Sequence, residues 1–305
     1  MHASATSSSD SGDLLPPHWS QCGQLGFIIR SIYKPRKMTR VRNVEEGIKH
    51  VTWFVQPLLS VLGAWPMNVT SSVRSKTLKW FLIFIIYFLQ LAVMIPSILF
   101  IILKVKNNRS RIKLIMPHVN SVCQLSKYTV LLRRNNEIRQ LLNDLKYDWL
   151  HATKEDQWIY TTRASIGHRL MMPFVILLYT GGTSLRAIIP LLRGKIVLPN
   201  NTTMRLLPCP GYFVFFNEQL TPNYEIIFAM QVLCGFINYT TLCGTLALCS
   251  MLCLHMCSMM RILANKMTQL SNQSDTDENA VQEKITDIVE YHTKIKRYLH
   301  YLNNS

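Results

Sequence analysis

Two long stretches of this chain contain no charged side chain, and they constrain the fold more than any other feature. One covers residues 80–103 and the other covers residues 226–260. About 20 apolar residues suffice to cross the roughly 30 Å of hydrocarbon in a bilayer. Across all 305 residues only 16% are charged, whereas a soluble domain usually carries about a quarter. The sequence therefore predicts an all-α, polytopic helical membrane protein.

Four membrane spans are predicted, at about residues 80–103, 114–132, 170–192 and 226–260. The second is the least apolar because it contains His118, Asn120 and Lys127, and a charge at mid-bilayer costs about 3 kcal/mol. The fourth exceeds what a bilayer needs, so we expect it to tilt or to project into the cytosol.

Three segments outside the spans have their own patterns. Residues 1–37 are polar and Ser-rich, which predicts a disordered extension without the apolar core of a cleavable signal peptide. Residues 44–65 predict an amphipathic helix that is too short to span and is either interfacial or re-entrant. Residues 281–302 carry apolar side chains at alternating spacings of four and three, which predicts a cytosolic helix that packs against another helix.

The distribution of basic residues predicts the orientation. With the N-terminus in the cytosol, the inner segments carry 23 Lys and Arg residues and the outer loops carry 8. Cytosolic loops of membrane proteins carry this excess. Asn200 and Asn201 both begin glycosylation triplets in the loop that this orientation places outside. We therefore expect a multi-pass protein of the plasma membrane with a cytosolic N-terminus and glycosylation at these two residues.

The composition and motifs argue against other functions. The net charge of +16 is carried largely by loops that flank apolar runs, where it would meet lipid headgroups rather than nucleic acid. No His-Glu-x-x-His, Gly-x-Ser-x-Gly or phosphate-loop motif occurs, so no enzyme activity and no cofactor are predicted. Cys249, Cys253 and Cys257 share one helix face but lack other ligands nearby, so no metal site is predicted.

Several segments together resemble the insect odorant receptor family. The resemblance covers about residues 38–305 and rests on the order of these segments relative to the spans. They are Gly63-Ala-Trp65-Pro66 before the first span, Asn143 to Trp149 after the second, Pro208 to Tyr212 and Leu220 to Glu225 before the fourth, and Ile285 to Ile295 in the tail.

The resemblance implies a seven-helix receptor with its N-terminus inside. Such receptors are odorant-gated cation channels that assemble with a co-receptor subunit, bind volatile small molecules in the outer half of the bundle, and line their pore with the seventh helix. This sequence stops before the fifth helix, so we expect a truncated receptor that conducts no ions alone. The helix at 281–302 would belong to the cytosolic anchor of the assembly.

The resemblance also suggests candidate residues. For an apolar volatile ligand the pocket should be apolar with a few polar groups. The candidates on the outer halves of helices two to four are Met116, Asn120, Tyr179, Thr183, Ile227, Met230 and Leu233. Contacts between subunits are predicted for His292, Ile295 and Leu299, with packing inside one subunit as the alternative.

Two other receptor classes compete with this interpretation. A gustatory receptor of the same superfamily would be distinguished by its seventh helix, which this sequence does not contain. A G-protein-coupled receptor requires an outside N-terminus, which the charge distribution opposes. A membrane-embedded transferase would require pairs of His or Asp in the spans, and the spans hold only scattered polar residues.

Overall fold

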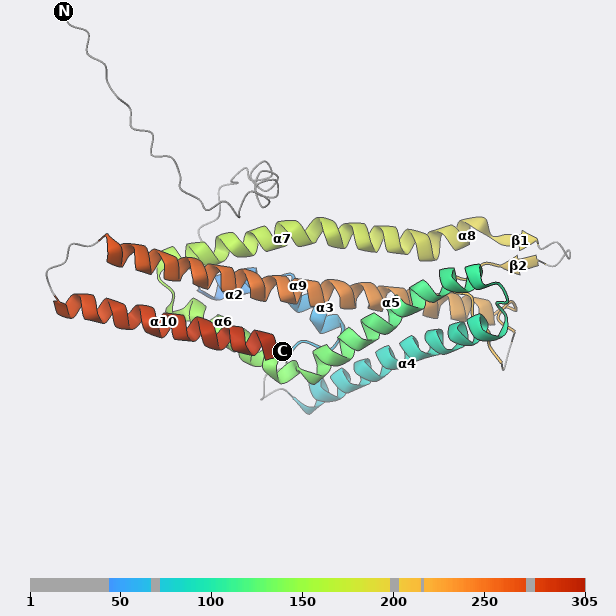
Figure 1. The fold of residues 1–305 in the computed structure, drawn as a ribbon. Helices are drawn as coiled ribbons and strands as arrows, with labels where there is room; N and C mark the ends of the chain where they lie inside the picture. The colour runs from blue at the N-terminus through green and yellow to red at the C-terminus, as the bar shows by residue number, and fades with distance from the viewer. Residues whose placement is uncertain (1–43, 67–71, 198–202, 215–216, 273–277, 305) are drawn as a thin grey trace, which may run out of the picture. The chain divides into compact units, whose positions relative to one another are not determined.

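A computed structural model describes residues 44–66, 72–197, 203–214, 217–272 and 278–304 (Figure 1). The chain divides into two units at residues 42 and 43, and the description concerns the second unit alone. The extension predicted at residues 1–37 lies outside the described residues.

The segment predicted as one amphipathic helix at 44–65 forms two helices, α2 (Val44–Thr52) and α3 (Val55–Val61). Pro57 explains the break, because its ring would clash with the carbonyl of residue 53 in a continuous helix. It occupies the first turn of α3, where a missing N–H costs nothing. Gly63 ends the segment with a φ of 65°, the left-handed conformation that favours glycine.

Two long helices follow as an antiparallel pair (Figure 1). Helix α4 (Val73–Leu103) contains the predicted first span, and α5 (Asn108–Arg133) contains the predicted second span. Asn107 caps α5, since its side chain accepts a hydrogen bond from the N–H of Arg109 at 3.0 Å.

Helix α6 (Asn135–His151) leads into α7 (Lys154–Thr183). A π-helical turn, η2 (Ser184–Ile188), joins α7 to α8 (Ile189–Arg193), and the three together contain the predicted third span. In the π turn the N–H of Ile189 donates to the carbonyl of Ser184, five residues back. The wider turn directly precedes Pro190, whose ring cannot fit the ordinary helical hydrogen-bond pattern.

Strands β1 (Lys195–Val197) and β2 (Thr203–Arg205) form a small antiparallel hairpin in which Ile196 pairs with Met204. Helix α9 (Asn223–Ser271) contains the predicted fourth span, and α10 (Glu278–Asn304) contains the predicted tail helix. We call the end of the bundle that carries β1 and β2 the hairpin end, and the end where α6 and α10 lie the α10 end (Figure 1).

Helix α9 is the central element of the bundle. It contacts α3, α4, α5, α7 and α10, and its 49 residues make it about 74 Å long at 1.5 Å per residue. That length exceeds a bilayer by more than twofold. The helix can therefore cross the hydrocarbon and still form the core of the α10 end, where Leu145, Trp149 and Met259 are almost completely buried.

Three helical segments of the described chain are long and apolar enough to cross a membrane: Val73–Leu103, Lys154–Arg193 and Asn223–Ser271. Helix α5 does not meet this condition, which agrees with the low apolar content noted for residues 114–132. The fold is that of an all-α membrane protein with several long apolar helices.

Candidate ligand-binding site

A small cavity of about 10 Å³ lies between the helices toward the hairpin end. It is bordered by residues of α4, α5, η2, the loop before α9, and α9 itself: Gln90, Val93, Met94, Pro117, His118, Ser121, Arg186, Cys209 and Cys234. That volume holds about one water-sized group. The cavity therefore fits one polar group of a ligand rather than a whole molecule.

A buried polar cluster borders this cavity. The amide of Gln90 donates to Asn238 Oδ1 at 2.7 Å, and the thiol of Cys234 donates to Gln90 Oε1 at 3.3 Å. Gln90 and Asn238 are 5% and 2% exposed. Polar groups buried at membrane depth need partners, so this cluster joins α4 to α9 at a defined register.

The loop before α9 is fastened over the same region. Gln231 accepts a hydrogen bond from the backbone N–H of Cys209 at 3.0 Å and donates to its carbonyl at 2.7 Å. The N–H of Tyr212 donates to the carbonyl of Pro96 at 2.9 Å. Burial raises the pKa of the Cys209 thiol, and the nearby Arg186 partly opposes the shift. The loop therefore closes the cavity between α4 and α9.

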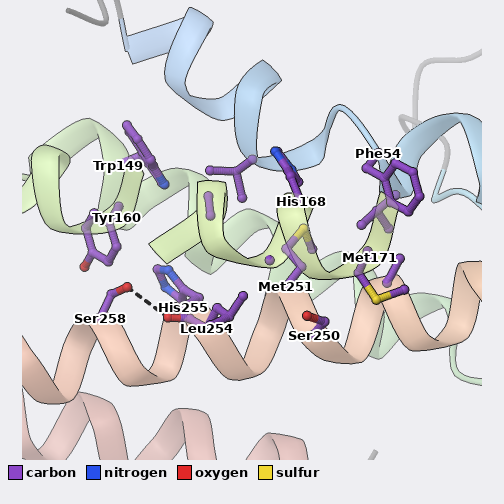
Figure 2. A pocket seen from close by; sticks show the side chains of 15 residues that line it. Phe54, Trp149, Tyr160, His168, Met171, Ser250, Met251, Leu254, His255 and Ser258 are labelled. Atoms are coloured by element: carbon purple, nitrogen blue, oxygen red, sulfur yellow. Dashed lines mark hydrogen bonds between the residues drawn. The ribbon is translucent and has the colours of Figure 1, made fainter. Parts of the chain in front are cut away.

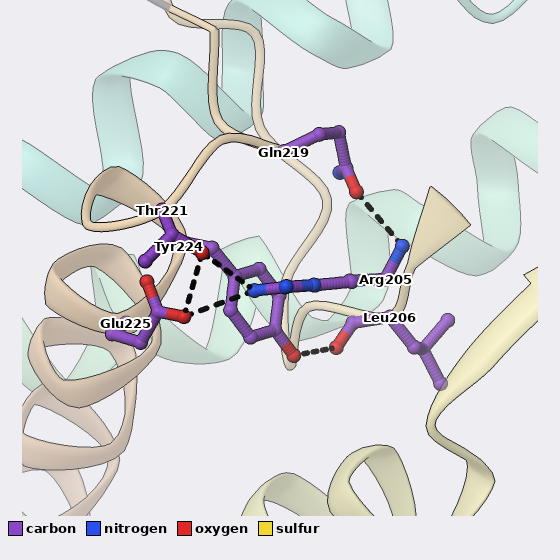
Figure 3. Close-up of polar contacts among 6 residues, drawn as sticks. All are labelled: Arg205, Leu206, Gln219, Thr221, Tyr224 and Glu225. Carbon is purple, nitrogen blue, oxygen red and sulfur yellow. Dashed lines mark hydrogen bonds and ion pairs between the residues drawn. The ribbon is translucent and has the colours of Figure 1, made fainter. Parts of the chain in front are cut away.

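Polar contacts join β2 to the start of α9 (Figure 3). The guanidinium of Arg205 donates to Glu225 Oε1 at 2.9 Å and to Thr221 Oγ1 at 3.2 Å. The Tyr224 hydroxyl donates to the carbonyl of Leu206 at 2.9 Å. These contacts hold the hairpin against the helix whose residues border the cavity.

Arg186 borders the cavity from the π turn. Its aliphatic stem lies along Gly235 of α9, where an added Cβ would be 3.1 Å from Arg186 Cδ. Its guanidinium carbon is 5.8 Å from the centroid of the Tyr239 ring, close enough for a cation–π interaction. The close approach of α7 and η2 to α9 depends on glycine on both sides, since a Cβ at Gly182 would be 2.3 Å from Tyr239 Cζ.

None of the seven predicted ligand-binding residues borders this cavity. Met116, Asn120 and Leu233 are exposed on the described chain, and Ile227 is buried. Tyr179, Thr183 and Met230 are half-buried, and the hydroxyl of Tyr179 lies 2.6 Å from that of Thr240. The seven residues stay predictions, because no bound ligand tests them.

Sequence reasoning did not select Gln90, Asn238 or Arg186. A signal was present: Gln90 is a strongly polar residue within a long uncharged run, and Arg186 is the one charged residue between 170 and 192. Polar and charged residues in membrane spans mark functional sites by default. Their convergence required the tertiary structure.

A second cavity, of about 30 Å³, lies among α2, α3, α6, α7 and α9 (Figure 2). Phe54, Trp149, Met171 and Met251 supply most of its apolar wall, and His168 and His255 border it. It has room for one or two water molecules. Because its walls are largely the residues of the hydrophobic core, we interpret it as a packing gap and not as the ligand site.

A buried ion-pair network lies next to this gap. Asp148 of α6 accepts from His255 Nε2 of α9 at 3.0 Å, and Lys294 of α10 contacts its other oxygen. The Tyr160 ring stacks on the His255 ring at 5.0 Å. Burial alone would raise the pKa of Asp148, but the hydrogen bonds from His255 and Lys294 outweigh it and lower the pKa.

The residues predicted for subunit contacts have different environments. Ile295 is 4% exposed and packs in the core of this chain, which is the alternative weighed for it. His292 and Leu299 are exposed on α10, so they stay candidates for contacts with another subunit. Asn200 and Asn201 lie outside the described residues.

Among the residues that the structure describes, no group of three or more His, Cys, Asp or Glu side chains could hold a metal ion. The site is thus built from membrane helices, amide and thiol side chains, and one guanidinium. This arrangement defines the class: a multi-span helical membrane protein with a small polar cavity between its helices.

A family model described as 7tm Odorant receptor matches residues 109–305. The match extends over more than half of the chain, and the chain belongs to the odorant receptor family. No curated protein matches the sequence.

Solved structures support the same fold. The insect olfactory receptor OR5 from Machilis hrabei, in complex with eugenol, is similar with a TM-score of 0.63 and 12% identity. The match covers 85% of this chain and 64% of that receptor. A second structure of the same receptor gives a TM-score of 0.62 at 12% identity, covering 84% and 66%. The chain therefore spans about two thirds of the length of these receptors, with a shared fold.

Proposed function

We propose that this chain is an odorant receptor subunit that binds a volatile small molecule at the hairpin end of its bundle. The observation that supports the proposal is the cavity bordered by Gln90, Arg186 and Cys234 in a chain of the odorant receptor family. A volatile ligand suits an apolar site with a few placed polar groups. The cavity combines Val93, Met94 and Pro117 with such groups.

The site would bind one polar group of the odorant inside the cavity. The cavity holds about one water-sized group, so the odorant's oxygen would enter it while the apolar remainder lies against the helices. Tyr179, Thr183 and Met230 are half-buried on the same helices. They are the candidates for contact with that remainder.

In the proposed receptor the ligand controls a cation channel formed with a co-receptor subunit. The exposed apolar side chains of α10, among them Val289 (57% exposed) and Leu299 (42%), support a contact with another subunit. Conduction is proposed for the assembly with the co-receptor. The N-terminus is proposed to lie in the cytosol of a cell-surface receptor.

Co-expression tests the receptor function. Cells that express this chain with an odorant co-receptor are exposed to a panel of volatile acids, esters, alcohols and phenols while cation currents are recorded. We expect currents that require both subunits and at least one odorant. Odorant responses identical to those of the co-receptor alone would contradict the proposal.

A variant pair locates the site. Asn238→Leu removes the buried partner of Gln90 and is expected to weaken odorant binding about tenfold, roughly the effect of one lost hydrogen bond to a buried group. Leu246→Ala, on an exposed face of the same helix, serves as its control. Equal effects of the two substitutions on odorant affinity would argue against this cavity.

A further inference from the structure

Arg186 has an unusual electrostatic situation. It lies in the Lys154–Arg193 segment, one of the helices long enough to cross a membrane, and it is half-buried. A guanidinium stays charged at all physiological pH values, and a charge at membrane depth is costly unless it is paired. An arginine in this place therefore calls for an explanation.

The described part of the chain supplies no carboxylate for it. No Asp or Glu among the described residues forms an ion pair with Arg186, and Glu225, an acidic residue of the hairpin end, already pairs with Arg205 at 2.9 Å. Arg186 contacts Gly235 along its stem, and it contacts Tyr239 through the ring and through a side-chain hydrogen bond. Both position the side chain, but neither neutralises its charge.

The guanidinium instead borders the cavity that the proposed function assigns to the odorant. The other polar groups there are one amide, two thiols and a hydroxyl, together with His118. The side-chain amide of Gln90 already donates a hydrogen bond to Asn238. Arg186 is thus the strongest hydrogen-bond donor that borders the cavity.

We propose that Arg186 is the specificity-determining residue of the odorant site and that it selects ligands with a carboxylate head. The inference rests on the proposed function and adds the class of ligand. A carboxylate matches the planar, two-pronged geometry of a guanidinium. It also supplies the countercharge that the described residues lack.

The size of the cavity agrees with this ligand class. About 10 Å³ has room for one water-sized group, so one carboxylate oxygen would enter the cavity, with Val93, Met94 and Pro117 beside it for the start of an apolar tail. A small aliphatic acid has this shape: one ionised head and one short hydrocarbon chain. An ester of the same atoms presents only acceptor oxygens without charge.

The test compares two isomers. Hexanoic acid and methyl pentanoate contain the same atoms, and only the acid is ionised at pH 7.4. Their affinities are measured by isothermal titration calorimetry on the purified full chain in lipid nanodiscs. We expect the wild-type chain to bind the acid at least tenfold more tightly than the ester, as a charged hydrogen bond predicts.

Three variants separate the role of Arg186 from general charge effects. Arg186→Gln should weaken acid binding at least tenfold and remove the preference for the acid, with a smaller loss of ester binding, because an ester oxygen accepts an uncharged hydrogen bond from glutamine as well. Arg186→Lys keeps the positive charge but loses the two parallel N–H donors of the guanidinium, so it should weaken acid binding about threefold to tenfold. Arg193→Gln changes an exposed arginine at the end of the same helical segment, and it should keep the wild-type preference. Size-exclusion profiles and melting temperatures show whether each variant is folded.

Each outcome bears on the inference. A preference for the acid that survives in Arg186→Gln overturns it, as does an equal loss in Arg193→Gln. Should Arg186→Gln fail to fold, unchanged acid binding by Arg186→Lys overturns it. If the wild-type chain binds both isomers equally, the inference fails while odorant binding stands. If it binds neither of these nor any member of the odorant panel, the proposed function fails as well.

Discussion

At the scale of single residues, Asp148 links three helices at the α10 end. One carboxylate, 5% exposed as a residue, connects α6 to His255 of α9 and to Lys294 of α10. The rings of Tyr160 and Tyr298 lie 5.0 and 5.6 Å from the His255 ring. The side chains of His255 and Asp148 are each 3% exposed, and a buried charge without its partner is costly.

Asp148→Asn is expected to destabilise the chain by about 3 kcal/mol, the lower part of the range for breaking a buried ion pair. The lower part applies because the Lys294 side chain is 36% exposed and can regain water. The measurement is thermal unfolding in detergent. Asp287→Asn is the control, since Asp287 pairs with Lys266 at 2.6 Å on the surface, where such pairs contribute about 0–1 kcal/mol. Equal losses of stability from the two substitutions would contradict a larger contribution from the buried Asp148 pair than from the surface pair.

The stabilising effect of Asp148 also has a defined pH dependence. Its pKa is lowered in the folded chain, so its contribution is present above the unfolded pKa of about 3.9 and is lost as pH falls through the folded pKa. The difference in melting temperature between wild type and Asp148→Asn should be constant from pH 7 to about pH 5. It should shrink below about pH 4. A difference that grows on acidification would be the opposite of what this network requires.

At the scale of elements, the packing of α7 against α9 depends on which glycine faces the partner helix. Gly181 and Gly182 are neighbours, yet a Cβ at Gly181 would meet nothing within 4 Å, whereas one at Gly182 would be 2.3 Å from Tyr239 Cζ. Tyr239 is also in contact with Tyr179 and Arg186, so its ring cannot move freely. Close helix approach through small residues is a common device in membranes.

Substituting the two glycines separately tests this contact. Gly182→Ala should destabilise the chain by about 1–3 kcal/mol, as overpacking does, and should weaken acid binding because Tyr239 also contacts Arg186. Gly181→Ala should be neutral or stabilising by up to about 1 kcal/mol, since alanine favours helix. Melting temperatures of the two variants in detergent provide the comparison. Similar effects from both substitutions would contradict the close contact.

At the scale of the whole molecule, the basic residues predict the orientation of the bundle in the membrane. The charge distribution predicts that the loop between α8 and α9 lies outside and that the C-terminal end of α9 lies inside. Glycosylation triplets occur on both sides of α9, at Asn200 and Asn201 before it and at Asn272 after it. The two ends therefore serve as internal reporters of orientation.

Translation in the presence of microsomes tests the orientation. We expect glycosylation that disappears in the double variant Asn200→Gln and Asn201→Gln and that is unaffected by Asn272→Gln. The shift in gel mobility and its reversal by endoglycosidase are the measurements. Modification that depends on Asn272 alone would invert the proposed topology.

The sequence alone determined the long helices, because an uncharged run can be satisfied in a membrane only by helical hydrogen bonding along its own backbone. It also predicted the tail helix from its spacing, and the order of the helices indicated the family. It did not determine the break near Pro57 or the π turn before Pro190, which depend on local steric detail.

Only the tertiary structure showed which faces of the helices pack against each other. In a membrane span, apolar side chains suit lipid and protein neighbours alike, so hydrophobic periodicity did not separate the exposed Met116 and Leu233 from the buried Ile227. On α10, Ile288, Tyr291, Ile295 and Tyr298 face the bundle, whereas Ile285 and Leu299 of the predicted seam are exposed.

The polar contacts of Gln90 with Asn238 and of Asp148 with His255 join residues more than a hundred positions apart. Only the packing of α4, α6 and α10 on α9 brings such residues together.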